Sequence, residues 1–202
     1  MNLISKIYRR FLKLIFGFDK WHISPLKERP YAIDIIRYCN KLSTRSFFAE
    51  IGCGLGDITR NVLFENRTGY DMDEKVLKAA RFLPVIGSRK SITYKVFHFP
   101  ETLLSGSLNV LTMVNWIHHV EPETLKTKLS EYFNKNLLTK GEIIIDTVQD
   151  PTYKYNHDIK FLSKDLNCSI HCLGKYARKR EVWAIKKLNW SYVRIRRRYK
   201  SL

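Results

Sequence analysis

The chain has 202 residues, 45% of them hydrophobic, with only 9 glycines and 6 prolines, so its composition excludes a globally disordered protein and suits one α/β domain. Its 36 lysines and arginines against 19 aspartates and glutamates give a net charge of +17, which attracts nucleic acid, anionic lipid and phosphorylated substrates alike. The cysteines are too few and too scattered for a disulfide framework, which favours a reducing cytoplasm.

Residues 1–20 are predicted to form a basic amphipathic helix over about 3–18. Apolar side chains recur there at spacings of three and four, and four basic residues lie between them: Lys6, Arg9, Arg10 and Lys13. These charges interrupt every apolar run, so the segment is too short and too charged to cross a bilayer. Two interpretations stay open. Residues 1–18 lie on an anionic membrane surface, or the helix packs its apolar face on the core or on a second subunit.

Residues 21–45 form a lead-in with a predicted helix over 30–41, and the first strand follows over 46–51. After this strand comes a turn with glycine at three alternate positions, Gly52, Gly54 and Gly56. Glycine lets the backbone turn sharply and lets a ligand approach where a Cβ atom would block it. This order indicates the start of a domain that binds a nucleoside-bearing ligand.

A helix is predicted over 57–65 and a second strand over 67–71, ending in Asp71, where an acid accepts hydrogen bonds from ribose hydroxyls. In a dinucleotide site the third glycine comes three residues after the second, whereas here it comes two residues after it. Glu50, two residues before the first glycine, would sit badly against a pyrophosphate but would suit a cationic amino group. The pattern therefore favours S-adenosylmethionine over NAD as the cofactor.

The remaining elements alternate between strand and helix up to a final pair of strands. We expect helices over 74–82, 122–136 and 158–165, and strands over 92–97, 108–114, 142–148, 168–174 and 181–188. This alternation implies an α/β fold with a doubly wound, mostly parallel sheet and ligands at the carboxyl ends of its strands. The last two strands are predicted to form a terminal antiparallel hairpin, followed by a basic tail over 191–202.

Four motifs in this order resemble those of the class I (Rossmann-like) S-adenosylmethionine-dependent methyltransferases. The first motif of that family reads hydrophobic, acid, x, Gly, x, Gly, x, Gly, as residues 49–56 do. Asp71 holds the place of the family's ribose-binding acid, residues 109–119 match the fourth strand with its His-His tail, and residues 141–147 match the fifth strand. The resemblance covers residues 46–190 and implies a methyltransferase domain that uses S-adenosylmethionine.

The resemblance also implies a set of cofactor-binding residues: Glu50, Gly52, Cys53, Gly54, Gly56, Asp71, Met72, Asn115 and Trp116. The acid or amide that binds adenine after the third strand of the family is missing here, so we expect His98 to take this role or Phe99 to stack on the base. Arg29, in the lead-in, is assigned to the cofactor's carboxylate, with capping of local structure as the alternative.

Three histidines are candidates for a catalytic base. His119 is preferred, with His118 beside it and His157 in the loop after the fifth strand. In O-methylation a positioned base helps the hydroxyl proton leave as the methyl group transfers, and histidine is a common choice. Each histidine can instead serve the strand-to-helix turn structurally. No metal site is expected, because the Cys-x-x-x-Cys pair near the C-terminus lacks a second pair of ligands.

The acceptor is inferred from two further patterns. Enzymes that methylate amino groups of adenine or cytosine usually carry an Asn/Asp-Pro-Pro-aromatic motif after the fourth strand, whereas residues 115–118 read NWIH. The Trp-His pair at 21–22 and the Arg-Pro-Tyr stretch at 29–31 resemble small bacterial methyltransferases associated with surface-polysaccharide synthesis. With the basic helix, this implies O-methylation of a small-molecule glycan or a lipid-linked sugar acceptor, in the cytoplasm and with peripheral attachment at the inner membrane.

Two other functions stay open. The basic surface, with the run over 194–200, would serve an RNA methyltransferase, although no RNA-binding module is recognisable. The chain could also be a non-catalytic subunit that binds the cofactor or the membrane beside a catalytic partner. The sequence leaves the oligomeric state open.

Overall fold

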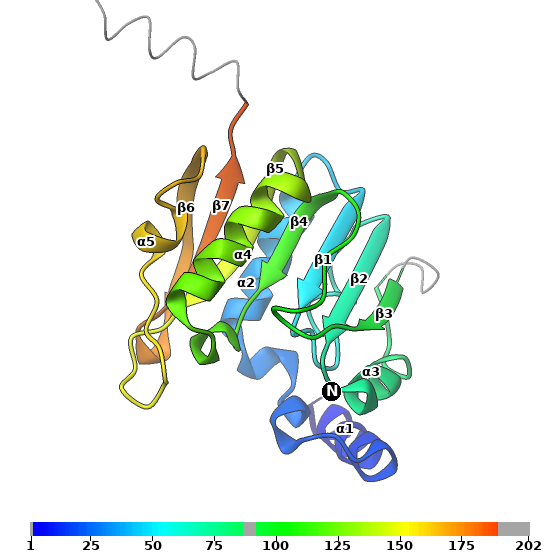
Figure 1. Ribbon diagram of the computed structural model, residues 1–202. Coiled ribbons are helices and arrows are strands. Elements are labelled where there is room, and N and C mark those ends of the chain that lie inside the picture. Colours follow the sequence, from blue (N-terminus) through cyan, green and yellow to red (C-terminus); the bar gives the residue numbers. More distant parts are fainter. Residues whose placement is uncertain (1, 87–91, 190–202) are drawn as a thin grey trace, which may run out of the picture.

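The computed structural model describes residues 2–86 and 92–189, which form a seven-stranded sheet flanked by helices (Figure 1). The strands are β1 Phe47–Ile51, β2 Asn66–Asp71, β3 Ile92–Val96, β4 Leu108–Met113, β5 Leu137–Thr147, β6 Cys168–Tyr176 and β7 Arg180–Lys187. The α-helices are α1 Asn2–Phe16, α2 Pro30–Lys41, α3 Glu74–Ala80, α4 Pro122–Lys135 and α5 Ile159–Ser163. Short 3-10 turns are η1 Lys20–Ile23, η2 Leu26–Glu28, η4 Ile117–His119 and η5 Ala177–Lys179.

The strand order across the sheet is β3-β2-β1-β4-β5-β7-β6. From β3 to β5 in this order, neighbouring strands run parallel. β7 pairs antiparallel with both β5 and β6. The doubly wound, mostly parallel sheet with a terminal antiparallel hairpin is therefore confirmed.

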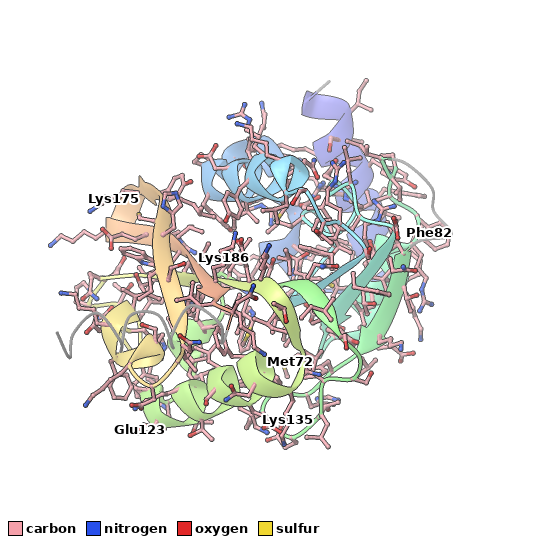
Figure 2. All side chains as sticks on the ribbon, turned by 90° about the horizontal axis from the view of Figure 1, so that it is seen from above. Met72, Phe82, Glu123, Lys135, Lys175 and Lys186 are labelled. Atoms are coloured by element: carbon pink, nitrogen blue, oxygen red, sulfur yellow. The ribbon has the colours of Figure 1, made fainter. Side chains whose placement is uncertain are left out.

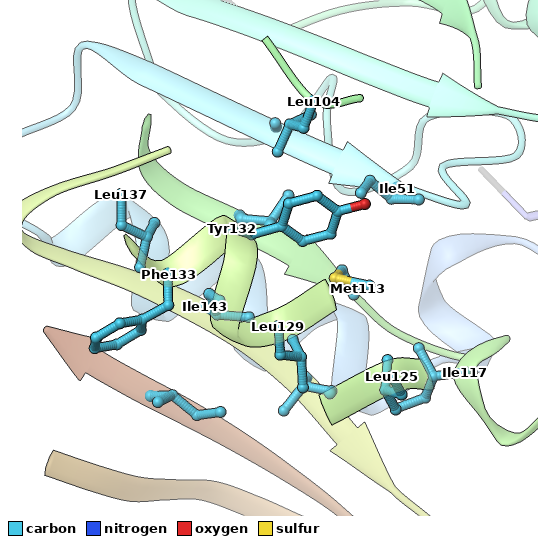
Figure 3. Close-up of a cluster of buried hydrophobic side chains, with 14 of the residues drawn as sticks. Ile51, Leu104, Met113, Ile117, Leu125, Leu129, Tyr132, Phe133, Leu137 and Ile143 are labelled. Atoms are coloured by element: carbon cyan, nitrogen blue, oxygen red, sulfur yellow. The ribbon is translucent and has the colours of Figure 1, made fainter. Parts of the chain in front are cut away.

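The central strand β4 is buried on both faces of the sheet. Successive residues of a strand point to opposite sides, so its side chains enter two separate clusters. Leu111 and Met113 of β4 belong to an apolar cluster with side chains of α4, whereas Val110 belongs to a second cluster with side chains of α2. Figure 3 shows the first cluster, in which Leu125 and Leu129 of α4 lie beside Met113. This two-sided core holds β4 in the middle of the sheet, where its carboxyl end meets that of β1.

β6 is an edge strand and carries charge at its exposed edge. The Lys175 side chain is 74% exposed and pairs with Glu181 of β7 over 2.7 Å; Figure 2 shows it extending away from the hairpin. Charged side chains on an edge strand disfavour pairing with a strand of another chain. The charge of Lys175 therefore protects this edge of the sheet against pairing with another chain.

The predicted helix over 57–65 is wrong, because residues 54–61 form a series of turns. Two backbone hydrogen bonds of helical spacing are present, from Arg60 to Gly56 and from Val62 to Ile58, but Asn61 between them donates to a carbonyl only three positions earlier. The Thr59 N–H donates to the Glu50 carboxylate at 2.9 Å. The segment therefore makes successive turns and no continuous helix.

The other predicted elements are present with shifted ends. β5 begins at Leu137, five residues before its predicted start, and has 11 residues. α5 has only 5 residues and α3 ends at Ala80. The basic tail over 191–202 lies outside the described residues. None of the helices described is long and apolar enough to cross a membrane.

Helix α1 packs on the domain, but not through the apolar face that its sequence pattern displays. Leu12 is buried with side chains of α3, and Arg9 is buried beside it. Ile4 and Leu14, by contrast, are 75% and 85% exposed. The helix thus packs on the core through a narrow strip other than the predicted apolar face, and that face meets solvent.

Candidate functional site

The candidate site lies at the carboxyl ends of β1 and β4. β1 pairs with β2 on one side and with β4 on the other, so the order of the strands reverses at this point. Loops that leave neighbouring strands in opposite directions open a crevice there, and ligands of doubly wound sheets bind in it. Figure 1 shows α1 beyond the same edge of the sheet.

The first glycine of the turn lies against Trp116. Gly52 has a φ of +76°, and a Cβ atom there would lie 2.3 Å from Trp116 Cδ1. The indole N–H of Trp116 donates to the Ile51 carbonyl at 2.7 Å, and Phe99 packs edge-on against the indole with ring centroids 5.1 Å apart. Two residues predicted from the sequence, Trp116 and Phe99, thus form an aromatic wall beside the turn.

The second glycine lies against His22 of the lead-in. A Cβ atom on Gly54 would lie 2.5 Å from His22 Nδ1. The Gly54 N–H donates to Asp71 Oδ2 at 2.7 Å, so the acid at the end of β2 is held beside the turn. Burial lowers the pKa of His22, although the carboxylates of Asp71 and Asp73 act in the opposite direction. An imidazole therefore covers the turn next to the predicted ribose-binding acid.

Glu50 lies behind the turn. Its Oε2 atom accepts hydrogen bonds from the Thr59 N–H at 2.9 Å and from the Thr59 hydroxyl at 2.5 Å. Burial raises the pKa of Glu50 to about 7, even though these hydrogen bonds and the charge of Arg29 lower it. The carboxyl group at the base of the turn therefore changes its charge near neutral pH.

Asp57, just after the third glycine, is buried among three arginines. Arg9 of α1 donates to its two carboxylate oxygens over 3.0 and 2.6 Å, and Arg29 and Arg60 also donate to it. Three guanidinium groups thus share one carboxylate. Burial lowers the pKa of Arg60 to about 10. Arg29 has the most exposed side chain of the three, at 28%, so it is the one within reach of an anionic ligand group.

The remaining predicted cofactor residues lie at different depths. Cys53 is buried in the apolar cluster of α1 and α3. Met72, directly after Asp71, is 71% exposed (Figure 2). His98 is exposed, and its backbone N–H donates to the Thr102 hydroxyl at 3.0 Å. Of the two candidates for adenine binding, only Phe99 belongs to the aromatic wall, where it packs against Trp116.

Asn115, Asp146 and Arg180 form a hydrogen-bonded group at the ends of β4, β5 and β7. The Asn115 N–H donates to Asp146 Oδ1 at 2.8 Å, and Arg180 donates to Asp146 and, over 2.9 Å, to Asn115 Oδ1. Asn115 has a φ of +70°, a conformation that asparagine tolerates better than most residues. The Arg180 guanidinium lies 4.8 Å from the centre of the Tyr31 ring. These contacts fix a polar surface beside the aromatic wall.

Of the three candidate histidines, His118 and His119 lie together, and His157 forms a hydrogen bond with the turn that carries them. The His118 ring packs against Tyr153 with centroids 3.8 Å apart, and against His119, at an angle of 56°, with centroids 4.4 Å apart. Burial, helped by neighbouring positive charges, lowers the pKa of His118 to about 4, so it is neutral at pH 7. His119 is exposed. His157 is buried, with Nε2 2.9 Å from the Ile117 carbonyl, to which it donates.

The sequence prediction missed several residues of this site, among them Arg9, Asp57, Asp146 and Arg180. Asp57 follows the glycine turn directly and Asp146 ends the fifth apolar run, so their positions were visible signals. Nothing in the sequence around Arg180 indicates that it belongs to the site, because its position depends on the register of β7 against β5. Among the described residues no group of three His, Cys, Asp or Glu side chains is placed to hold a metal ion.

No protein-family model matches this chain, and no curated protein matches it either. Solved structures do. The N-methyltransferase NodS from Bradyrhizobium japonicum WM9, in complex with S-adenosyl-L-homocysteine, matches with a TM-score of 0.66 and 15% identity over 90% of this chain and 99% of its own. The magnesium protoporphyrin IX methyltransferase ChlM from Synechocystis PCC 6803 matches with a TM-score of 0.60 and 13% identity over 85% of this chain and 86% of its own.

A third match is CalS10 from Micromonospora echinaspora, an amino pentose methyltransferase, with a TM-score of 0.58 and 11% identity over 86% of this chain and 94% of its own. The chain has the fold of the class I S-adenosylmethionine-dependent methyltransferases. With identities of 11% to 15%, the likeness is one of fold. In this methyltransferase fold the glycine turn, Asp71 and the aromatic wall all lie at the one edge where the strand order reverses.

Proposed function

We propose that this protein is an S-adenosylmethionine-dependent methyltransferase that O-methylates a glycan or a lipid-linked saccharide at the inner face of the membrane. The observation that carries the proposal is the glycine turn beside Asp71 at the switch point of a methyltransferase fold. Structures of similar fold contain S-adenosylmethionine or S-adenosyl-L-homocysteine, which supports the same cofactor here. Residues 46–190 would form the catalytic domain.

The residues present fit this cofactor. Three guanidinium groups around the single Asp57 carboxylate leave positive charge for the cofactor's carboxylate, and Arg29 is the exposed member. Asp71, at the end of β2, would bind the ribose. It accepts a hydrogen bond from the glycine turn, and the exposed Met72 follows it directly. Phe99 offers an aromatic face for the base. Glu50 would favour the cationic amino group once it loses its proton.

The chemistry needs few groups from the protein. S-adenosylmethionine, when bound, supplies a methyl group on a positively charged sulfur. His119, exposed beside the end of β4, would take the proton of the acceptor hydroxyl as its oxygen bonds to the methyl carbon. His118 would position His119 through contact between the two rings. The fixed group of Asn115 and Arg180 would hold the acceptor in line, and alignment of this kind supplies much of the acceleration.

Two observations support a saccharide acceptor near a membrane. The similar structure CalS10 is an amino pentose methyltransferase, so this fold accommodates a sugar. The exposed apolar face of α1, with basic residues beside it, suits a membrane surface that presents lipid-linked molecules. The exposed side chain of Asn115, held by the buried Arg180, offers hydrogen-bond partners to sugar hydroxyls.

The cofactor is tested by titration calorimetry with S-adenosylmethionine and, separately, NAD, on the wild-type protein and on Asp71→Ala. We expect binding of S-adenosylmethionine alone, weakened by the substitution. Transfer of labelled methyl groups to lipid-linked saccharides, free glycans and RNA then identifies the acceptor. Methylation of RNA would replace the saccharide proposal. Cofactor binding without turnover on any acceptor would indicate a non-catalytic subunit, and failure to bind S-adenosylmethionine would refute the enzyme proposal.

A further inference from the structure

The side chains of α1 fall into three arcs, because successive residues of an α-helix are rotated by about 100°. One arc, about 120° wide, is apolar and consists of Ile4, Ile7, Tyr8, Phe11, Leu14 and Ile15. The next faces the domain and consists of Arg9, Leu12 and Phe16. The third is basic and consists of Lys6, Arg10 and Lys13.

The apolar arc is open to solvent. Its six members are between 37% and 85% exposed. Phe82, after α3, extends it: its ring centroid lies 5.4 Å from that of Phe16, and its carbonyl accepts a hydrogen bond from the Tyr8 hydroxyl at 3.2 Å. Phe82 itself is 55% exposed (Figure 2). Soluble monomers rarely expose an apolar patch of this extent unless it binds something.

The domain-facing strip of the same helix reaches the candidate cofactor site. Arg9 is 2% exposed, and its guanidinium donates to both oxygens of Asp57 in the turn after the glycines. It also donates to the carbonyl of Ser24 in the lead-in at 3.2 Å. Leu12 packs in the cluster that contains Cys53 and Leu55 of the turn. A shift of α1 would therefore move the partners of the glycine turn.

The helix lies at the edge of the sheet that carries the site (Figure 1). The turn between β6 and β7 lies at that edge too, because Thr147 at the end of β5 pairs with Glu181 at the start of β7. This turn exposes Arg178 and Lys179. Apolar side chains, basic side chains and the candidate site thus share one edge of the molecule.

We propose that α1 docks this protein on an anionic membrane surface through its apolar arc, and that docking strengthens cofactor binding because the opposite strip of the helix holds the glycine turn. The second part rests on the cofactor of the proposed function, whereas the first specifies its membrane contact and rests on α1 alone. Apolar side chains would enter the boundary of the acyl chains, and Lys6, Arg10 and Lys13 would meet the headgroups.

The distribution of charge and apolar side chains on α1 favours a membrane as its partner over a second copy of the chain or nucleic acid. A second copy of the chain, paired through α1, would bring two basic arcs together in addition to a net charge of +17 on each copy. Nucleic acid would suit the basic arc but would leave the isoleucine and leucine side chains of the apolar arc without partners. An anionic bilayer satisfies both arcs at once.

Vesicle sedimentation tests the docking. Wild-type protein should bind phosphatidylglycerol-containing vesicles at least about ten-fold more tightly than pure phosphatidylcholine vesicles, since each basic residue near the surface contributes about five-fold. Phe11→Ser with Leu14→Ser should lose most of the binding. The control is Leu63→Ser. Leu63 is 46% exposed and lies just before β2, at the opposite edge of the sheet. This variant should bind vesicles as the wild type does.

Two results would overturn the docking. One is equal, weak binding of the wild type to both kinds of vesicle. The other is a dimer in sedimentation velocity that the Phe11→Ser, Leu14→Ser variant abolishes, because α1 would then bind a second copy. A circular dichroism spectrum of each variant, matched to that of the wild type, shows that the domain is folded.

Calorimetry with S-adenosylmethionine tests the coupling. Wild-type affinity should rise about five-fold or more when anionic vesicles are added, the usual size of a coupling between two sites. Arg9→Met should still bind vesicles but show no such rise, since it lacks the link to Asp57. An unchanged wild-type affinity would refute the coupling. Vesicle binding by a protein that binds no S-adenosylmethionine at all would refute the proposed function and leave the docking in place.

Discussion

Glu50 at the end of β1 accepts hydrogen bonds from both the backbone N–H and the hydroxyl of Thr59, nine residues further on. The pair ties the turn after the glycines to the strand that precedes them, where the sequence pattern predicted a helix. Glu50 is 4% exposed, and burial raises its pKa to about 7 from a usual value of 4.5. The stability of the turn therefore depends on pH.

Glu50→Gln should make the stability of the protein less dependent on pH. A carboxyl group whose pKa is higher in the folded state contributes its stability below pH 4.5 and loses it as the pH rises through about 7. Urea unfolding at pH 5 and pH 8 should show the wild type losing stability between them, by on the order of 3 kcal/mol for this group. Glu50→Gln should remove that loss. The exposed Glu101→Gln is the control and should follow the wild type; an identical slope for Glu50→Gln would contradict the raised pKa.

Binding of S-adenosylmethionine should release a proton near pH 7. About half of the Glu50 side chains carry a proton there, and a cationic ligand favours the charged carboxylate. Calorimetry in buffers of different ionisation enthalpy measures the number of protons released, which should fall to zero in Glu50→Gln. A buffer-independent enthalpy in the wild type would show that the cofactor does not act on this carboxyl group.

The sequence predicted the elements whose signal is local. The glycine turn, Asp71 and the tail after β4 lie in continuous stretches of chain, so their order was enough to indicate the fold. Arg9 and Asp57 are 48 positions apart, and nothing in either neighbourhood of the sequence indicates that they meet. The contact of Arg180 with Asn115 depends on the register of an antiparallel hairpin.

The predicted helix over 57–65 failed for a related reason. Its apolar spacing is helical, and two of its residues, Ile58 and Val62, are buried as a helix would bury them. Its backbone hydrogen bonds alternate between partners three and four positions earlier, and its Thr59 N–H donates to Glu50, outside the segment. Local periodicity thus predicted correctly which side chains are buried, but not the conformation of the backbone.

Asp57→Asn should destabilise the protein strongly. Removing the carboxylate leaves Arg9 and Arg60 buried without their anionic partner, and breaking a buried ion pair in this way costs about 3–5 kcal/mol. Chemical denaturation should show a large fall in the free energy of unfolding. Asp165→Asn, which breaks an exposed pair with Lys126, should leave the unfolding midpoint unchanged. Equal effects of the two substitutions would contradict the role of the arginine cluster.

Gly52→Ala should displace Trp116. The new Cβ atom would lie 2.3 Å from the indole, and the positive φ adds about 1 kcal/mol of backbone strain. We expect a change in tryptophan fluorescence, lower stability and weaker cofactor binding. In the Gly52→Ala, Trp116→Ala double variant the clash with the indole disappears. The double variant should therefore lose less stability than the sum of the losses in the two single variants. Strict additivity would show that the indole does not press on the turn.

The two neighbouring histidines should respond differently to substitution. His119→Gln should lower kcat about 100-fold or more, because it removes the proposed base. Burial lowers the pKa of His118 to about 4, so its ring is neutral above pH 5 and does not titrate between pH 5 and pH 9. His118→Phe, which keeps a ring against Tyr153, should therefore leave the shape of the kcat profile between pH 5 and pH 9 unchanged while lowering its height modestly. The profile is measured with the acceptor identified by methyl transfer. If His118→Phe abolished a titration within that range, His118 and not His119 would be the base.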